Sequence, residues 1–199
     1  MSIKSHHPMQ WLEKLSGVLK IVKCKLCDQP VALDQAFLAL EQILNETRAK
    51  DAALWWVGNG GSAAICSHLS QDALNKLGIR SMYLNDASLI TCMTNDFGYS
   101  KVYEKPLRTL VRNGDMLIAI SSSGNSENIL SCARLAKEKN MKLVTLSGFC
   151  EDNFLWNIKS DISFYLPVDL YGLVEVGHEA LLHSVIECMF LNEHKEKLD

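Results

Sequence analysis

The sequence lacks any apolar run of the roughly eighteen residues needed to cross a bilayer. It also lacks an excess of either charge, because 20 Lys and Arg residues against 23 Asp and Glu residues give a net charge of −3. Such a chain has no general attraction for nucleic acid or an anionic membrane, so an anionic ligand must be held locally. Residues 1–7 lack the apolar core of a signal peptide. We therefore expect a cytoplasmic protein that binds neither nucleic acid nor membrane.

Cysteine is present without the pattern of a disulfide framework. The seven cysteines are odd in number and scattered through apolar segments, which is typical of a reducing compartment where cysteine acts as a small apolar residue. Cys24 and Cys27 have the spacing of a redox or zinc motif, but no second pair follows and no glycine or proline frames them. We therefore expect neither role for this pair.

The length and composition indicate one domain over residues 1–199. Of the 199 residues, 48% are hydrophobic, and no composition break, repeat or low-complexity segment divides the chain. Two amphipathic stretches within about residues 8–49 predict an N-terminal helical segment. Because their apolar faces exceed what a single covered sheet needs, we expect them to help build a homo-oligomer. The sheet core is predicted over about residues 52–192.

Strand-like and helical patterns alternate from residue 52 onward. Such alternation predicts right-handed crossovers and a parallel sheet with helices on both faces, which is a three-layer α/β sandwich. Pro106 interrupts the longest helical pattern, so a bend or restart is expected near Lys105. The five strand-like runs are 53–57, 80–84, 115–120, 142–146 and 161–166, and the helical patterns lie near 62–76, 86–112, 126–139 and 171–192.

A glycine-rich turn, Gly-Asn-Gly-Gly-Ser at 58–62, joins the first of these strands to a helix. Three of its five positions have no side chain, so a ligand can approach the backbone. The helix that follows offers unpaired N–H groups with a partial positive charge. The turn is therefore a candidate site for a phosphate or a polar sugar, although such turns also serve only to pack a strand against a helix. The P-loop lysine and the dinucleotide glycine spacing are both missing, which disfavours a nucleotide site.

A second polar turn, Ser-Ser-Ser-Gly-Asn-Ser at 121–126, follows the strand-like residues 118–120. Hydroxyl groups and backbone amides at a helix N-terminus suit a phosphate monoester. Serine is also common as a helix cap, but four hydroxyls in six residues exceed what a cap needs. In open α/β sheets ligands bind at the carboxyl ends of the strands, where both turns are expected.

Three motifs in order resemble the sugar isomerase (SIS) domain: the glycine-rich turn, Asn-Asp-Phe-Gly at 95–98, and Ile-Ser-Ser-Ser-Gly-Asn-Ser at 120–126. Within that group the chain is most similar to the phosphoheptose isomerases, from about residue 35 to 192. The resemblance implies a five-stranded parallel sheet flanked by helices and a homotetramer. It also implies interconversion of sedoheptulose 7-phosphate and glycero-manno-heptose 7-phosphate, often with zinc.

The resemblance also implies roles for residues of the three motifs. The residues expected to contact the sugar are Asn59, Gly60, Gly61, Asn95 and Asp96, and those expected to hold the phosphate are Ser121, Ser122, Ser123 and Ser126.

An aldose–ketose isomerase needs a base next to the carbonyl and an acid or metal that stabilises the enediolate oxygens. His68 and Asp72 are four residues apart and so share a helix face, a spacing that also suits two metal ligands. On the last predicted helix, His183 follows Glu175 and Glu179, and spacing alone does not choose between these glutamates. The resemblance selects Glu175. It implies zinc ligands His68, Asp72, Glu175 and His183, an acid–base pair of Asp72 and His183, and substrate contacts from Asp72 and Glu175.

The chain departs from the phosphoheptose isomerases at two positions. Asp72 stands where they usually have a catalytic glutamate, and Glu175 stands where they commonly have glutamine. These changes fit a zinc site of altered geometry or an isomerase of another sugar phosphate. A non-catalytic SIS module that binds sugar phosphates or another protein is the alternative. Retention of His68, of a carboxylate at position 72 and of His183 favours catalysis. The other histidines, including His178, are interpreted as ordinary core or surface residues.

Overall fold

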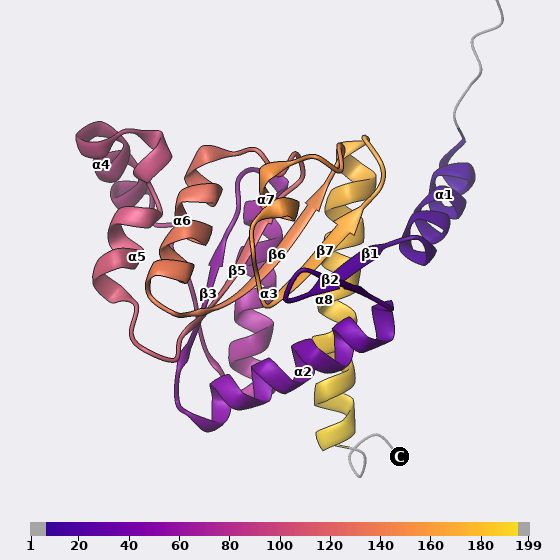
Figure 1. Cartoon of the computed structure of the whole chain (residues 1–199), viewed down its shortest axis with the longest axis horizontal. Coiled ribbons are helices and arrows are strands. Elements are labelled where there is room, and N and C mark those ends of the chain that lie inside the picture. The colour runs from indigo at the N-terminus through magenta and orange to yellow at the C-terminus, as the bar shows by residue number, and fades with distance from the viewer. Residues whose placement is uncertain (1–6, 195–199) are drawn as a thin grey trace, which may run out of the picture.

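The fold is built on a seven-stranded sheet with strand order β2-β1-β7-β6-β5-β3-β4 (Figure 1). The structure is a computed structural model and describes residues 7–194. The strands are β1 (Lys23–Leu26), β2 (Gln29–Val31), β3 (Ala53–Val57), β4 (Arg80–Tyr83), β5 (Met116–Ser121), β6 (Lys142–Gly148) and β7 (Ile162–Leu166). The helices are α1 (Pro8–Lys20), α2 (Leu33–Ala49), α3 (Gly61–Leu77), α4 (Ala87–Phe97), α5 (Glu104–Leu110), α6 (Glu127–Glu138), α7 (Phe154–Asn157) and α8 (Tyr171–Glu193).

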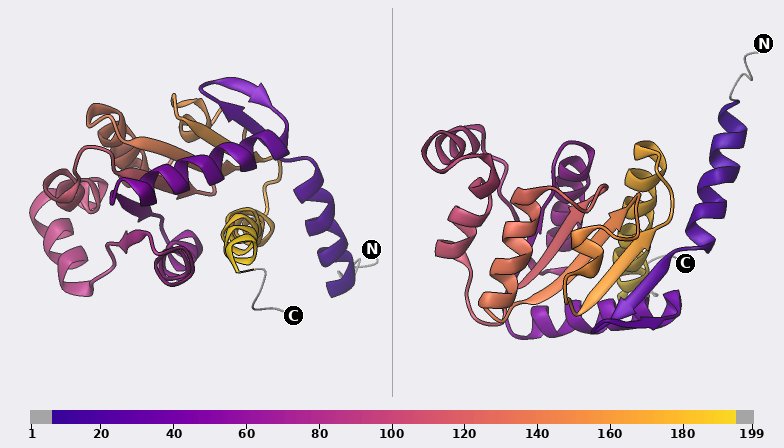
Figure 2. Two further views of the ribbon diagram at one scale, coloured as in Figure 1. Left: turned by 90° about the horizontal axis from the view of Figure 1, so that it is seen from below. Right: turned by 45° about the horizontal axis from the view of Figure 1, so that its top comes forward.

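The parallel α/β core is confirmed. Strands β3 to β7 pair in parallel throughout. Alternate side chains of β3 enter opposite cores, with Trp56 packing among α2, α3 and α8 and Trp55 packing among α5 and α6. Helices therefore cover both faces of the sheet (Figure 2). Every residue of β3 is buried, because parallel strands covered on both faces have no solvent side.

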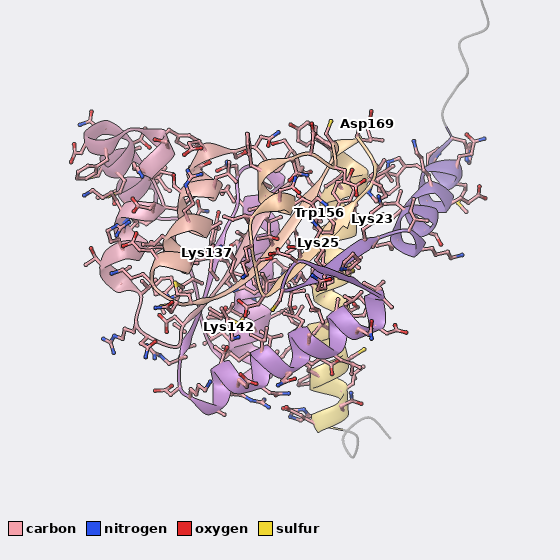
Figure 3. All side chains as sticks on the ribbon, viewed as in Figure 1. Lys23, Lys25, Lys137, Lys142, Trp156 and Asp169 are labelled. Atoms are coloured by element: carbon pink, nitrogen blue, oxygen red, sulfur yellow. The ribbon has the colours of Figure 1, made fainter. Side chains whose placement is uncertain are left out.

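The N-terminal segment contains two helices, α1 and α2, and a β-hairpin that was not predicted from the sequence separates them. β1 pairs antiparallel with both β2 and β7, so the sheet has two strands more than the five expected. The hairpin turns at Cys27 and Asp28, which both adopt positive φ angles of 47° and 69°. Lys25 of β1 extends over the Trp156 ring, with its Nζ atom 3.9 Å from the ring centroid (Figure 3). This contact joins the hairpin to α7.

The Cys24 and Cys27 side chains have different environments. Cys24 is buried on β1, where desolvation raises its pKa to about 12, whereas Cys27 is exposed in the turn. All seven cysteines lie within residues 7–194 and are free thiols there. A cytoplasmic location stays a prediction.

The long helical span predicted around Pro106 is interrupted, as expected. It consists of α4, a 3-10 turn η1 (Tyr99–Lys101) and α5, which restarts at Glu104, one residue before the predicted position. Pro106 lies in the first turn of α5, where its missing N–H breaks no helical hydrogen bond. Across residues 7–194, no helix is both long and apolar enough to cross a membrane.

The sheet topology brings the two polar turns side by side. The chain passes from β3 to β4 on one side and then to β5 on the other side of β3, so its direction reverses between β3 and β5. The glycine-rich turn follows β3 and the serine-rich turn follows β5. Both turns therefore border the crevice at this topological switch point, which is where open α/β sheets bind ligands.

Candidate active site

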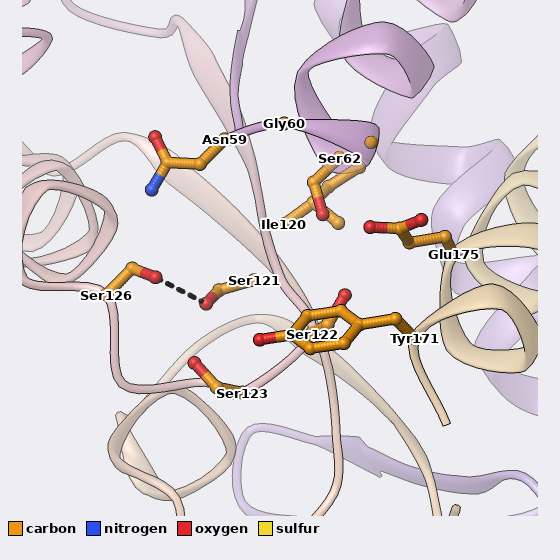
Figure 4. A pocket seen from close by; sticks show the side chains of 11 residues that line it. Asn59, Gly60, Ser62, Ile120, Ser121, Ser122, Ser123, Ser126, Tyr171 and Glu175 are labelled. Atoms are coloured by element: carbon orange, nitrogen blue, oxygen red, sulfur yellow. Dashed lines mark hydrogen bonds between the residues drawn. The ribbon is translucent and has the colours of Figure 1, made fainter. Parts of the chain in front are cut away.

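A cavity of about 200 Å³ lies between the two turns and the start of α8 (Figure 4). It brings together most of the residues predicted to contact the substrate, namely Asn59, Gly60, Gly61, Ser121, Ser122, Ser123, Ser126 and Glu175. Ser62, Ile120 and Tyr171 also line it and were not predicted. Ser62 ends the glycine motif, so its position was a usable signal. Nothing local to Tyr171 indicates that the start of α8 reaches this cavity.

The hydroxyl groups of the serine-rich turn do not cap helix α6. Ser126 is the N-cap residue of α6, yet its side chain makes no capping hydrogen bond and instead accepts one from the Ser121 hydroxyl at 3.2 Å. The Ser122 hydroxyl is buried and has no partner among the described residues. A phosphate oxygen in the cavity would give these groups a charge-assisted partner at a helix N-terminus. The geometry therefore favours the ligand interpretation of this turn over the capping one.

The side chain of Asn59 holds the glycine-rich turn in place. Asn59 and Asn128 exchange two amide hydrogen bonds of 2.8 and 2.9 Å, and the Tyr99 hydroxyl donates to Asn59 Oδ1 at 3.0 Å. Asn95 and Asp96 lie near the end of α4 and are exposed, with Asn95 donating to Asp96 at 2.8 Å. They are not among the residues lining the cavity. Tyr99 thus links their segment to the site.

Three predicted metal ligands converge between α3 and α8. One ligand atom each from His68, Asp72 and His183 lies within 4.8 Å of the other two. His183 Nδ1 is 3.4 Å from Asp72 Oδ2, and His68 Nε2 is 3.8 Å from the same oxygen. His183 Nδ1 is also buried without a hydrogen-bond partner among the described residues. Two imidazoles and a carboxylate form a common zinc donor set, so the residues fit such an ion. We call them the trio.

Glu175 lies apart from the trio. Its carboxylate covers the α carbon of Gly61, where an added Cβ would overlap it. This places a negative charge at the positive N-terminal end of α3. Eight residues separate Glu175 from His183, which is about 12 Å along a helix axis. Neither Glu175 nor Glu179 belongs to the cluster formed by the trio within residues 7–194. Glu175 as a fourth zinc ligand therefore gains no support from the geometry, and its place is at the cavity.

Two charged residues beside the trio were not predicted. Lys76 Nζ lies 3.1 Å from Asp72 Oδ2 and also forms an ion pair with Glu187. Glu187 in turn approaches His183, with Oε1 3.8 Å from Nε2. The hydrogen bond to Glu187, followed by that to Asp72, holds the pKa of Lys76 above its ordinary value. Continuing the four-residue spacing beyond Asp72 and His183 would have found both residues.

His178 has a structural position on the buried face of α8. Its Nε2 atom donates to the Ser147 carbonyl at 3.0 Å, which leaves Nδ1 unprotonated and without a partner. Complete burial lowers the pKa of His178 to about 4. The histidine therefore stays neutral in the folded protein at neutral pH, which agrees with its interpretation as a core residue.

We expect acid to destabilise the protein through His178. Between pH 6.5 and about 4 the unfolded state binds a proton that the folded state does not, so stability falls as the pH falls. The full effect is on the order of 3 kcal/mol. Urea unfolding at pH 7 and pH 4.5 should show a smaller loss for His178→Leu than for the unmodified chain. An equal loss in both proteins would contradict this assignment.

Comparison with known proteins places the chain in a family. The sequence matches the SIS domain family over residues 26–148. A phosphoheptose isomerase of Helicobacter pylori is 31% identical over 163 residues, which cover 79% of this chain and 84% of that protein. The chain therefore belongs to the SIS domain family. It is an isomerase of that family, and the solved structures similar to it include phosphoheptose isomerases.

Two such structures match nearly the whole chain. The phosphoheptose isomerase of Neisseria gonorrhoeae has a TM-score of 0.75 and 26% identity, and the match covers 90% of this chain and 93% of that one. The enzyme from Francisella tularensis has a TM-score of 0.77 and 23% identity, with coverage of 93% and 96%. The similarity to the Francisella tularensis enzyme, at 23% identity, supports the fold alone.

Proposed function

We propose that the chain interconverts sedoheptulose 7-phosphate and glycero-manno-heptose 7-phosphate through an enediolate. The observation that carries this proposal is the placement of two kinds of group along α3 and α8. Serine hydroxyls line the cavity next to Gly61, and the imidazoles and carboxylate of the trio lie about 10 Å farther along α3, at His68. The resemblance to phosphoheptose isomerases supplies the seven-carbon substrate.

The serine-rich turn would hold the phosphate group. Its hydroxyls and the N-terminus of α6 supply donors without a nearby basic side chain among the residues lining the cavity. The turn at 58–62 would then contact the sugar through its backbone, with Glu175 accepting hydrogen bonds from sugar hydroxyls. These contacts would direct the carbonyl end of the sugar away from the phosphate, along α3 and α8.

The trio would carry out the proton transfers. In the ketose-to-aldose direction, Asp72 takes a proton from C1, and the electron pair of that bond forms the C1–C2 double bond of the enediolate. His183 protonates the former carbonyl oxygen and accepts the proton of the C1 hydroxyl. Asp72 then returns its proton to C2, which gives the aldose. Both residues end in the protonation state in which they began, and all atoms and electrons are conserved. His68, Asp72 and His183 would hold a zinc ion, which would supply a positive charge for the developing oxyanion.

The test is an NMR assay with purified protein and sedoheptulose 7-phosphate, with and without added zinc. We expect the aldose signal to appear, and to appear faster with zinc. A five- or six-carbon sugar phosphate run in parallel tests the substrate class. Turnover of the shorter sugar alone would contradict the heptose assignment while leaving the isomerase activity in place.

Replacing Ser121 and Ser123 together by alanine should raise the KM for the sugar phosphate about tenfold or more, because charge-assisted hydrogen bonds to phosphate are lost. The kcat should change less, since the trio is untouched. Ser131→Ala is the matched control, because Ser131 lies on α6 but outside the cavity lining. An unchanged KM in the double variant would count against phosphate binding at this turn.

We also propose that the chain assembles as a homotetramer. Helix α1 lies at the edge of the ribbon (Figures 1 and 2), where its buried Val18 packs against the hydrophobic core. Met9 and Leu12 on this helix are 57% and 51% exposed. A second copy would remove this apolar surface from water. Sedimentation velocity at micromolar concentration should show a tetramer, and a stable monomer would contradict the proposal.

A further inference from the structure

The positively charged side chain of Lys76 lies next to the carboxylate of Asp72. Its ammonium group is 3.1 Å from Asp72 Oδ2, the same oxygen that faces both histidines of the trio. The side chain of Asp72 is only 10% exposed, so water screens this pair less than a surface pair. On its other side the ammonium group contacts Glu187. Lys76 thus bridges two carboxylates contributed by α3 and α8.

We propose that Lys76 is a built-in competitor for the metal ion. In the metal-free protein its ammonium group neutralises Asp72. When a cation binds the trio, the ammonium group leaves Asp72 and remains paired with Glu187. Lys76 therefore lowers the metal affinity of the site and stabilises the metal-free protein. This inference rests on the metal site of the proposed function.

The charges of the cluster require such an exchange. Asp72 Oδ2 would be a ligand atom of the ion, and a divalent cation and an ammonium group repel each other strongly at this range. Glu187 is a second anion within reach of the same flexible lysine, and its side chain is 35% exposed. The displaced ammonium group therefore keeps a partner. The two α3 residues are one helical turn apart, so the exchange needs no backbone movement.

Lys76→Met separates the two roles of the lysine. Without the ammonium group, Asp72 and Glu187 repel each other in the metal-free protein, so its melting temperature in EDTA should fall by several degrees. The dissociation constant for zinc, measured by isothermal titration calorimetry, should fall about ten- to a hundredfold because the competitor is gone. The stability of the metal-free protein should therefore decrease while the affinity for zinc increases.

Two variants serve as controls. Lys76→Arg keeps a cation at this position and should restore both the melting temperature and the weaker zinc binding. Lys139→Met removes the same charge from the exposed end of α6 and should alter neither, which excludes an effect of net charge. These readouts do not depend on catalytic activity.

The outcomes distinguish this inference from the proposed function. Zinc binding of equal strength in the unmodified chain and Lys76→Met would overturn the competitor role and leave the metal site standing. Weaker binding in Lys76→Met would also overturn it, because the lysine would then support the site. Failure of every variant to bind zinc would refute the metal site, and this inference with it, whereas heptose isomerisation would still be decided by the NMR assay.

Discussion

Replacing Asp72 by asparagine is expected to lower kcat/KM for sedoheptulose 7-phosphate by about a hundred- to ten-thousand-fold, which is the usual contribution of a positioned acid–base group. The amide cannot accept the C1 proton, although it keeps the size and shape of the carboxylate. The loss should appear mainly in kcat, because the phosphate donors at the cavity are unaffected. Initial rates of aldose formation followed by NMR measure the change.

Glu179→Gln provides the matched control for this prediction. It removes a carboxylate from α8, one turn before His183, but Glu179 belongs neither to the trio nor to the cavity lining. We expect it to retain nearly full activity. A circular dichroism spectrum should show that Asp72→Asn is folded. If that folded variant kept the rate of the unmodified chain, Asp72 would not be the base and the proposed mechanism would be wrong.

The sheet core was predictable because its signals are local. A parallel strand covered on both faces must be a continuous apolar run, and each run in this chain ends in a turn that starts a helix. The N-terminal hairpin was not predictable in the same way. β1 has only four residues, two of them lysines, and its one buried side chain, Cys24, lies opposite Phe164 of β7. That environment depends on a strand far along the chain.

The residues of the candidate site show the same difference between local signals and long-range packing. Both polar turns follow directly from a strand–helix junction, and the pairing of His68 with Asp72 follows from helical spacing. Whether Glu175 or another residue faces this pair depends on how α3 and α8 lie side by side, which no local pattern specifies. In the structure Gly61 lies opposite Glu175, and Asp72 lies opposite His183. Lys76 and Glu187 join the cluster through the same register.

Replacing Gly124 by alanine is expected to destabilise the protein by about 3–5 kcal/mol and to abolish phosphate binding at the serine-rich turn. Gly124 has φ +66°, a conformation that a side chain disfavours, and its added Cβ would overlap the side chain of Asn153. Asn153 is buried and cannot move freely. Its amide donates to the Cys150 carbonyl at 2.7 Å, and its Oδ1 accepts from the Trp156 backbone at 2.8 Å.

Gly78→Ala isolates the contribution of the overlap with Asn153. Gly78 ends α3 with φ +64°, nearly the angle of Gly124, but an added Cβ there meets no atom within 4 Å. The control should therefore lose only the strain of a left-handed alanine, on the order of 1 kcal/mol. Urea unfolding measures both losses, and protection by inorganic phosphate reports on the turn. Equal losses of unfolding free energy in the two variants would show that the Asn153 side chain moves aside at little cost. The serine-rich turn would then not depend on close packing against α7.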